Sequence, residues 1–262
     1  MKHYPITFFV AGIVGSLAAI AVPGARAAEE GNFSVAAGFD YSTGKYGADR
    51  STDILSIPFV GMYSSGVWTF KLTVPYVQIT GPGGVLPGGI RTKAKTVATT
   101  KDTTVSGLGD VIAAATYGID PGNEQDPWVY LTGKIKFGTA GTALGTGRND
   151  YAAQVDVYQG FGRFTARGAL GYEVLGSPAG VSMNNVAYGI FGGYYRITDR
   201  TVGGAEMSLS QKSSAIGAEK RELTVYASHG LNEGLKIRGY LLKGFADGSP
   251  DRGFGLLLIS DL

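Results

Sequence analysis

Residues that commonly perform catalysis are scarce in this chain, and His229 is the only histidine after residue 27. Histidine is the usual general base at neutral pH, and beside Ser228 it could activate a hydroxyl nucleophile. The pair lies near the end of a run of alternating apolar and polar residues, and alternation places the ring of His229 on one face with Leu223 and Val225. We therefore interpret His229 as a histidine on an apolar face with no chemistry, and predict that the chain is not an enzyme.

No other set of residues has the spacing of a metal or cofactor site. The stretch from Asp120 to Asp126 contains Asn123 and Glu124 but lacks the ligand order of a calcium loop, so it reads as a solvated turn. The glycine-rich stretch from Gly81 to Gly89 lacks the Gly-Lys-Ser/Thr ending of a phosphate loop. The chain has no cysteine, which excludes disulfides and thiolate metal sites. We predict neither a metal nor a cofactor.

The first 27 residues have the pattern of a cleaved secretion signal. Lys2 and His3 precede an apolar run from Ile6 to Val22, and Ala25-Arg26-Ala27 supplies small residues around a cleavage site. The alternative is a spanning helix, which the short run and its internal glycines disfavour. The predicted domains are therefore a signal peptide over 1–27 and one mature domain over 28–262.

The charge of the predicted mature domain is balanced. Removal of Lys2 and Arg26 lowers the basic count from 23 to 21, which equals the 21 acidic residues. The sequence therefore predicts no nucleic-acid partner.

The mature domain consists of alternating runs typical of β-strands. From Val67 to Gln78, Trp68, Phe70 and Leu72 share one face, and polar side chains occupy the other. Each run has about the nine to eleven residues that a tilted strand needs to cross a bilayer. The expected strands cover residues 33–42, 53–62, 66–78, 106–118, 127–138, 150–161, 163–174, 185–195, 201–210, 221–230, 234–244 and 252–261.

The links between these runs alternate in length. The second, sixth, eighth and tenth links are brief, the odd-numbered links are longer, and the longest covers Ile79 to Val105. Short periplasmic turns and long outer loops are typical of outer-membrane barrels. The prediction is an all-β fold, a single antiparallel up-and-down transmembrane β-barrel of about twelve strands, in the bacterial outer membrane, with the long link folded over or into its mouth.

A soluble β-sandwich would also alternate and is the main alternative fold. The distribution of aromatic residues favours the barrel, because a barrel in a membrane carries aromatic girdles at both interfaces. The aromatic residues close to expected strand ends are Tyr41, Tyr63, Tyr76, Tyr117, Trp128, Tyr172, Tyr194 and Tyr195.

If the apolar faces contact lipid, the opposite faces line the lumen. The inward set holds seven cations and four anions, together with Gln154, Thr165 and Thr224, which predicts a pore that slightly favours anions. The alternative is a plugged structural or adhesive barrel whose ion pairs hold its shape and conduct nothing. The charged candidates are Lys71, Lys134, Lys136, Asp156, Arg163, Arg167, Glu173, Glu206, Glu222, Lys236 and Arg238.

A set of short motifs resembles a known family. The chain reads Gly107-Leu108-Gly109-Asp110 before a strand, then Lys136-Phe137-Gly138, Leu144-Gly145-Thr146-Gly147, Asn149-Asp150-Tyr151 and Gly171-Tyr172. This pattern resembles the outer-membrane transporters named for the meta-cleavage pathway of phenol degradation. The residues that match the family's recurring motifs are Gly107, Gly109, Asp110, Gly145, Gly147 and Asp150.

The resemblance implies a single barrel that admits small, often aromatic or otherwise hydrophobic, compounds, and it carries over no catalytic residues. Relatives often have a proline and a second aspartate where this chain reads Phe137-Gly138-Thr139-Ala140-Gly141. An outer-membrane lipid-modifying enzyme is the least favoured alternative function. Barrel enzymes of this kind work near the outer leaflet, whereas the predicted position of His229 is the periplasmic end of a strand.

The expected partners are membrane lipid, lipopolysaccharide, a small-molecule solute and the barrel-assembly machinery. Arg91, Lys93, Lys95 and Lys101 form a basic segment that could contact lipopolysaccharide phosphates. Assembly machinery favours a last strand with alternating apolar residues, and Phe254, Leu256, Leu258 and Leu262 share one face.

Overall fold

The structure is a computed structural model that describes residues 8–9, 19–20, 31–92, 101–123 and 125–262. The predicted signal peptide lies outside the described residues except for two short strands. These are β1 (Phe8–Phe9) and β2 (Ala19–Ile20), which pair with each other in a separate sheet. In the described part of the chain, no helix is long and apolar enough to cross a membrane.

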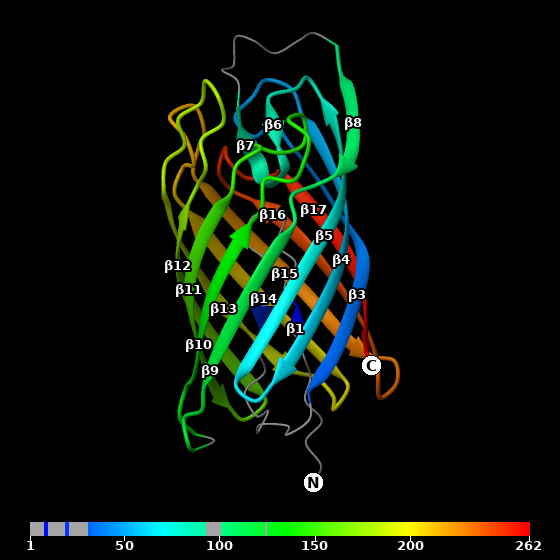
Figure 1. Ribbon diagram of the computed structural model, residues 1–262. Coiled ribbons are helices and arrows are strands. Elements are labelled where there is room, and N and C mark those ends of the chain that lie inside the picture. The colour runs from blue at the N-terminus through cyan, green and yellow to red at the C-terminus, as the bar shows by residue number, and fades with distance from the viewer. Residues whose placement is uncertain (1–7, 10–18, 21–30, 93–100, 124) are drawn as a thin grey trace.

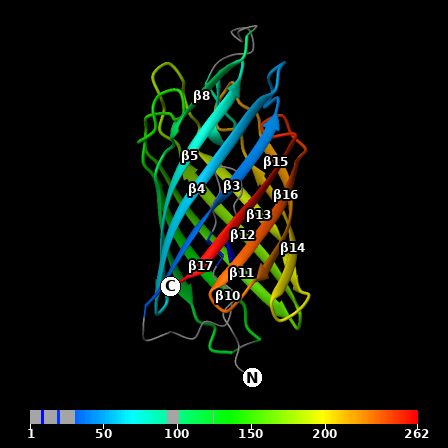
Figure 2. The same ribbon diagram turned by 90° about the vertical axis from the view of Figure 1, so that its right-hand side faces the viewer.

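The rest of the described chain forms one closed antiparallel barrel (Figures 1 and 2). Each strand pairs with the next along the chain, and the last pairs with the first through Arg252↔Thr43 to Asp261↔Ser34. The wall strands are β3 (Asn32–Gly44), β4 (Thr52–Ser65), β5 (Trp68–Gly81), β8 (Thr103–Leu108), β9 (Ile112–Ile119), β10 (Trp128–Lys136), β11 (Asp150–Phe161), β12 (Phe164–Val174), β13 (Val186–Arg196), β14 (Thr201–Ser210), β15 (Lys220–Gly230), β16 (Leu235–Gly244) and β17 (Arg252–Asp261).

These elements confirm the predicted barrel of twelve strands, because β8 and β9 both pair with β5 and form two parts of one wall strand. The prediction of one continuous strand over 106–118 was wrong. Residues 109–111 form a bulge, because the four steps from Leu108 to Ile112 lie opposite the three steps from Tyr76 to Thr73 on β5. Within the bulge, Gly109 N–H donates to the carbonyl of Pro75 at 2.8 Å and Asp110 is buried. The bulge places the carboxylate of Asp110 among interior groups.

The predicted alternation of link lengths also appears in the structure. The short links gather at one end, where β3 begins and β17 ends, and the long links gather at the other end (Figures 1 and 2). The longest link contains β6 (Val85–Leu86), the 3-10 turn η1 (Pro87–Gly89) and β7 (Ile90–Arg91). Its buried residues place this inserted segment, residues 82–92, within the mouth at the long-loop end.

The outward face of the barrel carries a belt of exposed apolar side chains. Leu170 is 75% exposed, Leu241 is 68% exposed and Phe59 is 54% exposed. A water-soluble protein rarely exposes a continuous apolar belt of this kind, so the belt favours contact with lipid over the soluble sandwich. Around the short-turn end the belt holds exposed aromatic side chains, namely Phe33, Tyr63, Trp68, Phe70, Tyr117, Phe161, Phe164 and Tyr195.

Two of the aromatic residues assigned to a girdle from the sequence lie inside the barrel instead. Tyr194 is buried in an interior apolar cluster, and Trp128 packs against that cluster. Proximity to a strand end does not specify a face, and in both strands the alternation points the ring inward. The same cluster contains the tyrosines Tyr130, Tyr158, Tyr226 and Tyr240.

Interior tyrosine rings lie over glycines that face them on the neighbouring strand. Gly204 pairs directly with Tyr226, and a Cβ atom at Gly204 would lie 2.5 Å from Cζ of that ring. Tyr240 covers its cross-strand partner Gly255 in the same way. Glycine supplies the space that each ring needs, and the ring shields the bare backbone of the glycine. These pairs fill the interior without bending the wall.

The substitution Gly204→Val tests this packing. A side chain at this position overlaps the Tyr226 ring, and such overpacking costs about 1–3 kcal/mol of folding free energy. The measurement is the temperature at which the folded band on a detergent gel converts to the unfolded band. We expect a clear decrease for Gly204→Val. Gly168→Val is the matched control, because nothing lies within 4 Å of a Cβ atom at Gly168. Equal conversion temperatures for both variants would contradict this account.

Candidate functional site

The candidate site is the interior wall of the barrel, which carries most of the charged residues singled out from the sequence. The structure places nearly all of these side chains inside, buried or half-buried. The inward charged residues from that set are Lys71, Lys134, Lys136, Asp156, Arg167, Glu173, Glu206, Glu222, Lys236 and Arg238.

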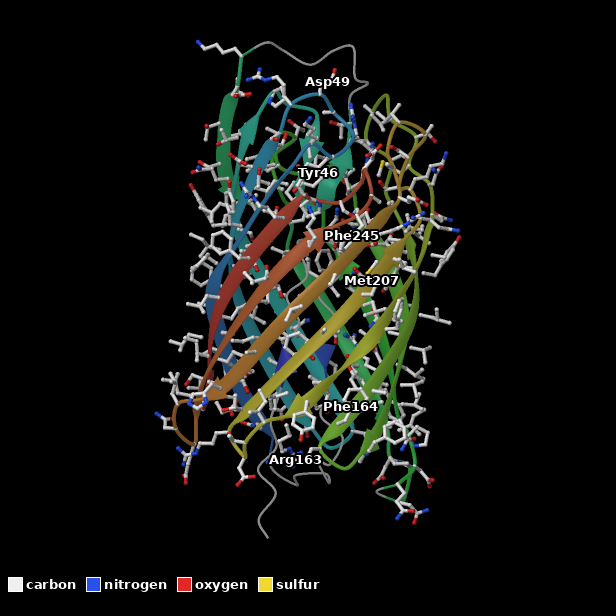
Figure 3. The ribbon with its side chains drawn as sticks, turned by 180° about the vertical axis from the view of Figure 1, so that it is seen from behind. Tyr46, Asp49, Arg163, Phe164, Met207 and Phe245 are labelled. Atoms are coloured by element: carbon white, nitrogen blue, oxygen red, sulfur yellow. The ribbon has the colours of Figure 1, made fainter. Side chains whose placement is uncertain are left out.

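Arg163 lies elsewhere. It is exposed at the turn between β11 and β12, where Nη2 donates to the carbonyl of Ile197 at 3.3 Å. Its guanidinium lies 5.9 Å from the centre of the Tyr195 ring. Figure 3 shows Arg163 at the short-turn end, below the interior groups. The turn ends the alternation that the sequence pattern extended to this residue, so Arg163 does not belong to the lumen.

An ion cluster centred on Arg167 crosses the interior wall from β11 to β14. The guanidinium donates to Asp156 Oδ1 at 2.7 and 3.1 Å, and to both carboxylate oxygens of Glu206 at 2.9 Å. Asp156 also accepts a bond from Gln154 at 2.7 Å, and Gln154 accepts one from Tyr188 at 2.8 Å. Buried charges are tolerated when they are paired and hydrogen-bonded, and this cluster meets both conditions.

Arg238 is the exception to this pairing. Its side chain is 1% exposed, and its guanidinium lies 4.0 Å from the centre of the Tyr226 ring. Within the described part of the chain, Nε and Nη1 have no hydrogen-bond partner. The Tyr226 hydroxyl also lacks one there. The stacked ring compensates part of the charge of this buried guanidinium.

Two interior lysines pair with carboxylates on other strands. Lys134 Nζ lies 3.8 Å from Glu173, a contact across β11. Lys236 Nζ lies 2.7 Å from Asp261 at the short-turn end. Both pairs join strands of the wall.

The structure adds interior carboxylates that the sequence reasoning missed. Asp40 accepts a hydrogen bond from Tyr240, and Asp110 and Asp150 both contact Lys136. Alternation with Ser42 and Ala36 could have placed Asp40 inside. The inward direction of Asp110 depends instead on the bulge after β8. With these acids included and Arg163 removed, the predicted excess of interior cations disappears and the wall is close to neutral.

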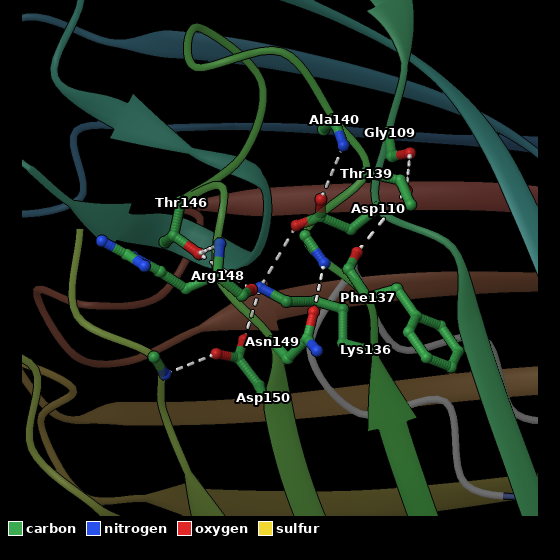
Figure 4. A network of polar contacts seen from close by, with 12 residues as sticks. Gly109, Asp110, Lys136, Phe137, Thr139, Ala140, Thr146, Arg148, Asn149 and Asp150 are labelled. Atoms are coloured by element: carbon green, nitrogen blue, oxygen red, sulfur yellow. Dashed lines mark hydrogen bonds and ion pairs between the residues drawn. The ribbon is translucent and has the colours of Figure 1, made fainter.

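Lys136 joins β10 to the two motif aspartates (Figure 4). Its Nζ lies 3.3 Å from Asp110 Oδ2 and also contacts Asp150. The carboxylates in turn accept backbone N–H groups, from Ala140 to Asp110 at 2.9 Å and from Gly176 to Asp150 at 2.7 Å. We name Asp110, Lys136 and Asp150 the wall clamp, because they fasten the loop 137–149 to the strands on either side.

The motif glycines make room for the wall clamp. A Cβ atom at Gly145 would lie 2.9 Å from both carboxylate oxygens of Asp110. One at Gly109 would lie 2.9 Å from a methyl group of Val77, and Gly147 has a φ of +64° that favours glycine. At Gly107 the neighbour is Leu144, 3.2 Å away. Residues that were only a resemblance in sequence therefore form one assembly in space.

The inserted segment packs above this assembly. Val85 joins Tyr46, Val77 and Leu144 in an apolar cluster, and Lys220 donates to the carbonyl of Gly88. The hydroxyl of Tyr46 lies 3.1 Å from Ser42, and burial raises the pKa of Tyr46. Figure 3 shows Tyr46 among the long loops. The segment narrows the mouth from within.

Arg91, the first residue of the basic segment expected to contact lipopolysaccharide, lies inside the mouth. Arg91 is 6% exposed and approaches the carbonyl of Tyr46 at 3.5 Å, so it points into the mouth. Lys101 is exposed. Lys93 and Lys95 lie outside the described residues.

A cavity of about 90 Å³ lies between the inserted segment and the wall. Its apolar side includes Pro75, Val77 and Ile112, and its charged side includes Lys134 and Glu173. The wall clamp also borders it. The cavity therefore brings apolar and charged groups together at the inner end of the mouth.

His229 and Ser228 do not form a catalytic pair. His229 is exposed, and its Nδ1 lies 2.8 Å from the Thr201 hydroxyl, whereas Ser228 is buried on the opposite face of β15. Among the described residues no group of three or more histidine or acidic side chains could hold a metal ion. At this position on β15, His229 is therefore not placed to act as a base for Ser228.

Comparisons with known proteins agree on the architecture. No protein-family profile matches the chain, and no curated protein matches it. An outer membrane channel from Pseudomonas putida F1 superposes with a TM-score of 0.69 at 13% identity, over 93% of this chain and 100% of that chain. The chain has the fold of an outer-membrane β-barrel.

Two further structures share this fold. The NanC porin gives a TM-score of 0.54 at 10% identity, over 87% of this chain and 98% of that chain. The beta domain of the Bordetella autotransporter BrkA gives 0.55 at 13% identity, over 89% of this chain and 100% of that chain. Because the identities are this low, the likeness concerns the fold and specifies no solute.

Removing the cation of the wall clamp with Lys136→Met tests its role. Two carboxylates then face each other without a counter-charge, so the loop 137–149 should loosen, and trypsin should cleave after the exposed Arg148 about tenfold faster. Limited proteolysis of the refolded barrel with mass spectrometry measures the rate. Lys243→Met removes the same charge from an exposed position and is the control. Cleavage no faster than in this control would show that Lys136 does not hold the loop.

Proposed function

We propose that the protein is a passive channel for small molecules in a bacterial outer membrane. The observation that carries this proposal is the division of side chains between the two faces of the closed wall. The outward face is an apolar belt, whereas the inward face carries ion pairs, hydroxyl groups and a cavity. A barrel needs a polar interior of this kind to let water and solutes approach its axis.

The proposed location in the outer membrane follows from the same difference between the outward and inward faces. A signal peptide over residues 1–27 directs export, and the domain over 28–262 inserts with its apolar belt in lipid and its long loops outside, next to lipopolysaccharide. The alternating apolar residues of β17 serve recognition by the barrel-assembly machinery. Exposed Phe254 and Leu258 on that strand support this role.

We further propose that the chain belongs to the transporter family of the meta-pathway of phenol degradation. Support comes from the motif residues, which are distant in sequence and meet at the wall clamp. The interior beside them carries both apolar and charged groups, which supports passage of small aromatic or otherwise hydrophobic solutes that carry a polar group.

One observation favours the alternative of a plugged barrel. The inserted segment occupies part of the mouth, and its carbonyl at Gly88 is held by Lys220. A segment held in this way either narrows a pore to a selective size or closes it. Ion conductance separates the two outcomes.

Conductance across a planar bilayer is the test of the channel. The protein is the mature domain, refolded until its gel mobility shifts on heating. We expect discrete current steps in potassium chloride, because charged and hydroxyl groups line much of the interior wall. A heat-modifiable barrel that gives no steps would overturn the channel and leave the plugged structural barrel.

Arg238→Met tests which group sets the selectivity. Arg238 has donors without hydrogen-bond partners in the described structure, so its loss should lower the chloride-to-potassium permeability ratio by about threefold. The reversal potential in a salt gradient measures this ratio. Arg163→Met is the matched control, because Arg163 lies at the exposed turn outside the lumen. Equal shifts in both variants would exclude a local role for Arg238.

A further inference from the structure

Basic side chains gather on the outward face of β15, β16 and β17, where these strands meet the long loops. Lys243 and Arg252 lie directly opposite each other in the ladder between β16 and β17, and both are exposed. Arg221 is exposed on the same face of β15. Neighbouring strands lie about 5 Å apart, so the three cations form one patch. We name Arg221, Lys243 and Arg252 the outer basic patch.

The outer basic patch lies at the edge of the apolar belt. The next outward pair of the same ladder, two residues closer to the short-turn end, is Leu241 with Phe254. These side chains are 68% and 45% exposed. Two residues of a strand span about 7 Å, so the cations lie one step beyond side chains suited to hydrocarbon. In a bilayer, the headgroups of lipids occupy that position.

The stability of the barrel does not explain why Lys243 faces Arg252. Like charges directly opposite each other destabilise a strand pair. Within the described part of the chain, neither side chain forms an ion pair with a carboxylate. Arg221 contacts Glu219, but both are exposed, and ion pairs of that kind contribute little. The patch therefore carries positive charge that the described barrel does not neutralise.

An open cleft between three long loops adjoins the outer basic patch. Its volume is about 700 Å³, and Arg221 belongs to its lining. Phe245 adds an aromatic ring that is 56% exposed, and Figure 3 shows this residue at the long-loop end of the wall. Side-chain amides can hydrogen-bond the hydroxyls of a sugar, and an aromatic ring can pack on its apolar face. The polar groups that the loops after β12, β14 and β16 contribute are Asn184, Asn185, Gln211, Lys212, Glu219 and Asp247.

We infer that the outer basic patch and this cleft together bind the headgroup of lipopolysaccharide, a phosphorylated sugar lipid of the outer leaflet. Lys243 and Arg252 contact its phosphates, and a guanidinium can donate two parallel N–H groups to one phosphate. The sugars lie in the cleft beside Phe245, and the acyl chains lie along Leu241 and Phe254. This inference rests on the proposed location in the outer membrane and adds a specific lipid site to it. The patch takes the role that the sequence suggested for the basic segment of the longest link.

Removal of the two facing cations tests the lipid site. The variant carries Lys243→Gln and Arg252→Gln, and the matched control carries Arg196→Gln and Arg200→Gln, which remove two exposed cations at the short-turn end. Native mass spectrometry of the refolded mature domain in detergent measures the Kd for lipid A that has two phosphates. We expect the Kd to rise about tenfold in the Lys243 and Arg252 variant, because basic side chains next to anionic lipid favour binding. The control should stay within about twofold of the unmodified protein.

Changes to the lipid test the same site on the unmodified protein. Lipid A without its phosphates should bind about tenfold more weakly, and it should no longer distinguish the unmodified protein from the double variant. Phe245→Ala should weaken the binding of both forms of lipid A by the same factor, about threefold, because the ring contacts sugar rather than phosphate. Inorganic phosphate at millimolar concentration should not displace lipid A, because it makes neither the sugar nor the acyl contacts.

The outcomes separate the lipid site from the channel. Equal Kd values for the two double variants, or equal affinities for lipid A with and without phosphates, would overturn the lipid site. Displacement by inorganic phosphate, or equally tight binding of phosphatidylglycerol, would replace it with a general anion site and overturn it as well. Planar-bilayer conductance is measured on the same preparations. A protein that binds lipid A as expected but does not conduct loses the channel and keeps the lipid site, whereas a conducting protein that fails the lipid tests keeps only the channel.

Discussion

Hydrocarbon offers no water to the N–H and C=O groups of a peptide, so every backbone polar group at that depth needs a partner in another strand. Pairing of β17 with β3 meets this requirement by closing the sheet into a ring. Closure also assigns each side chain to one of two surroundings, because neighbouring residues on a strand point to opposite faces. The apolar belt, the charged interior and the gathering of long loops at one end all follow from that ring.

The interior has to be filled without deforming the ring, and the chain uses two kinds of packing. Tyrosine rings such as Tyr226 and Tyr240 cover glycines on adjacent strands, so bulky and bare positions compensate each other. Charged groups are gathered into bonded clusters, of which Arg167 with Asp156 and Glu206 is the most extensive. Such clusters stabilise the wall when every donor and acceptor in them has a partner.

β8 has no ladder to β10 in the described chain, and side chains connect the two sides of the wall there. Lys136 bonds to both motif aspartates, and the nearby glycines let carboxylates and loop approach closely. The motif residues thus hold the loop 137–149 against the wall. The loop that they hold borders the cavity.

The sequence by itself determined the strand pattern, the barrel class and most of the inward charges, because a period of two is a local property that each strand displays independently. Tertiary structure decided what depends on contacts between distant strands. It set the bulge at Gly109 and Asp110 and the inward direction of Trp128 and Tyr194. It also excluded Arg163 from the lumen and paired the interior cations with carboxylates on other strands. Alternation predicts which face of a strand a residue occupies. It does not predict where the strand ends or which residue on another strand forms an ion pair with a given charge. Those relations exist only once the ring has closed.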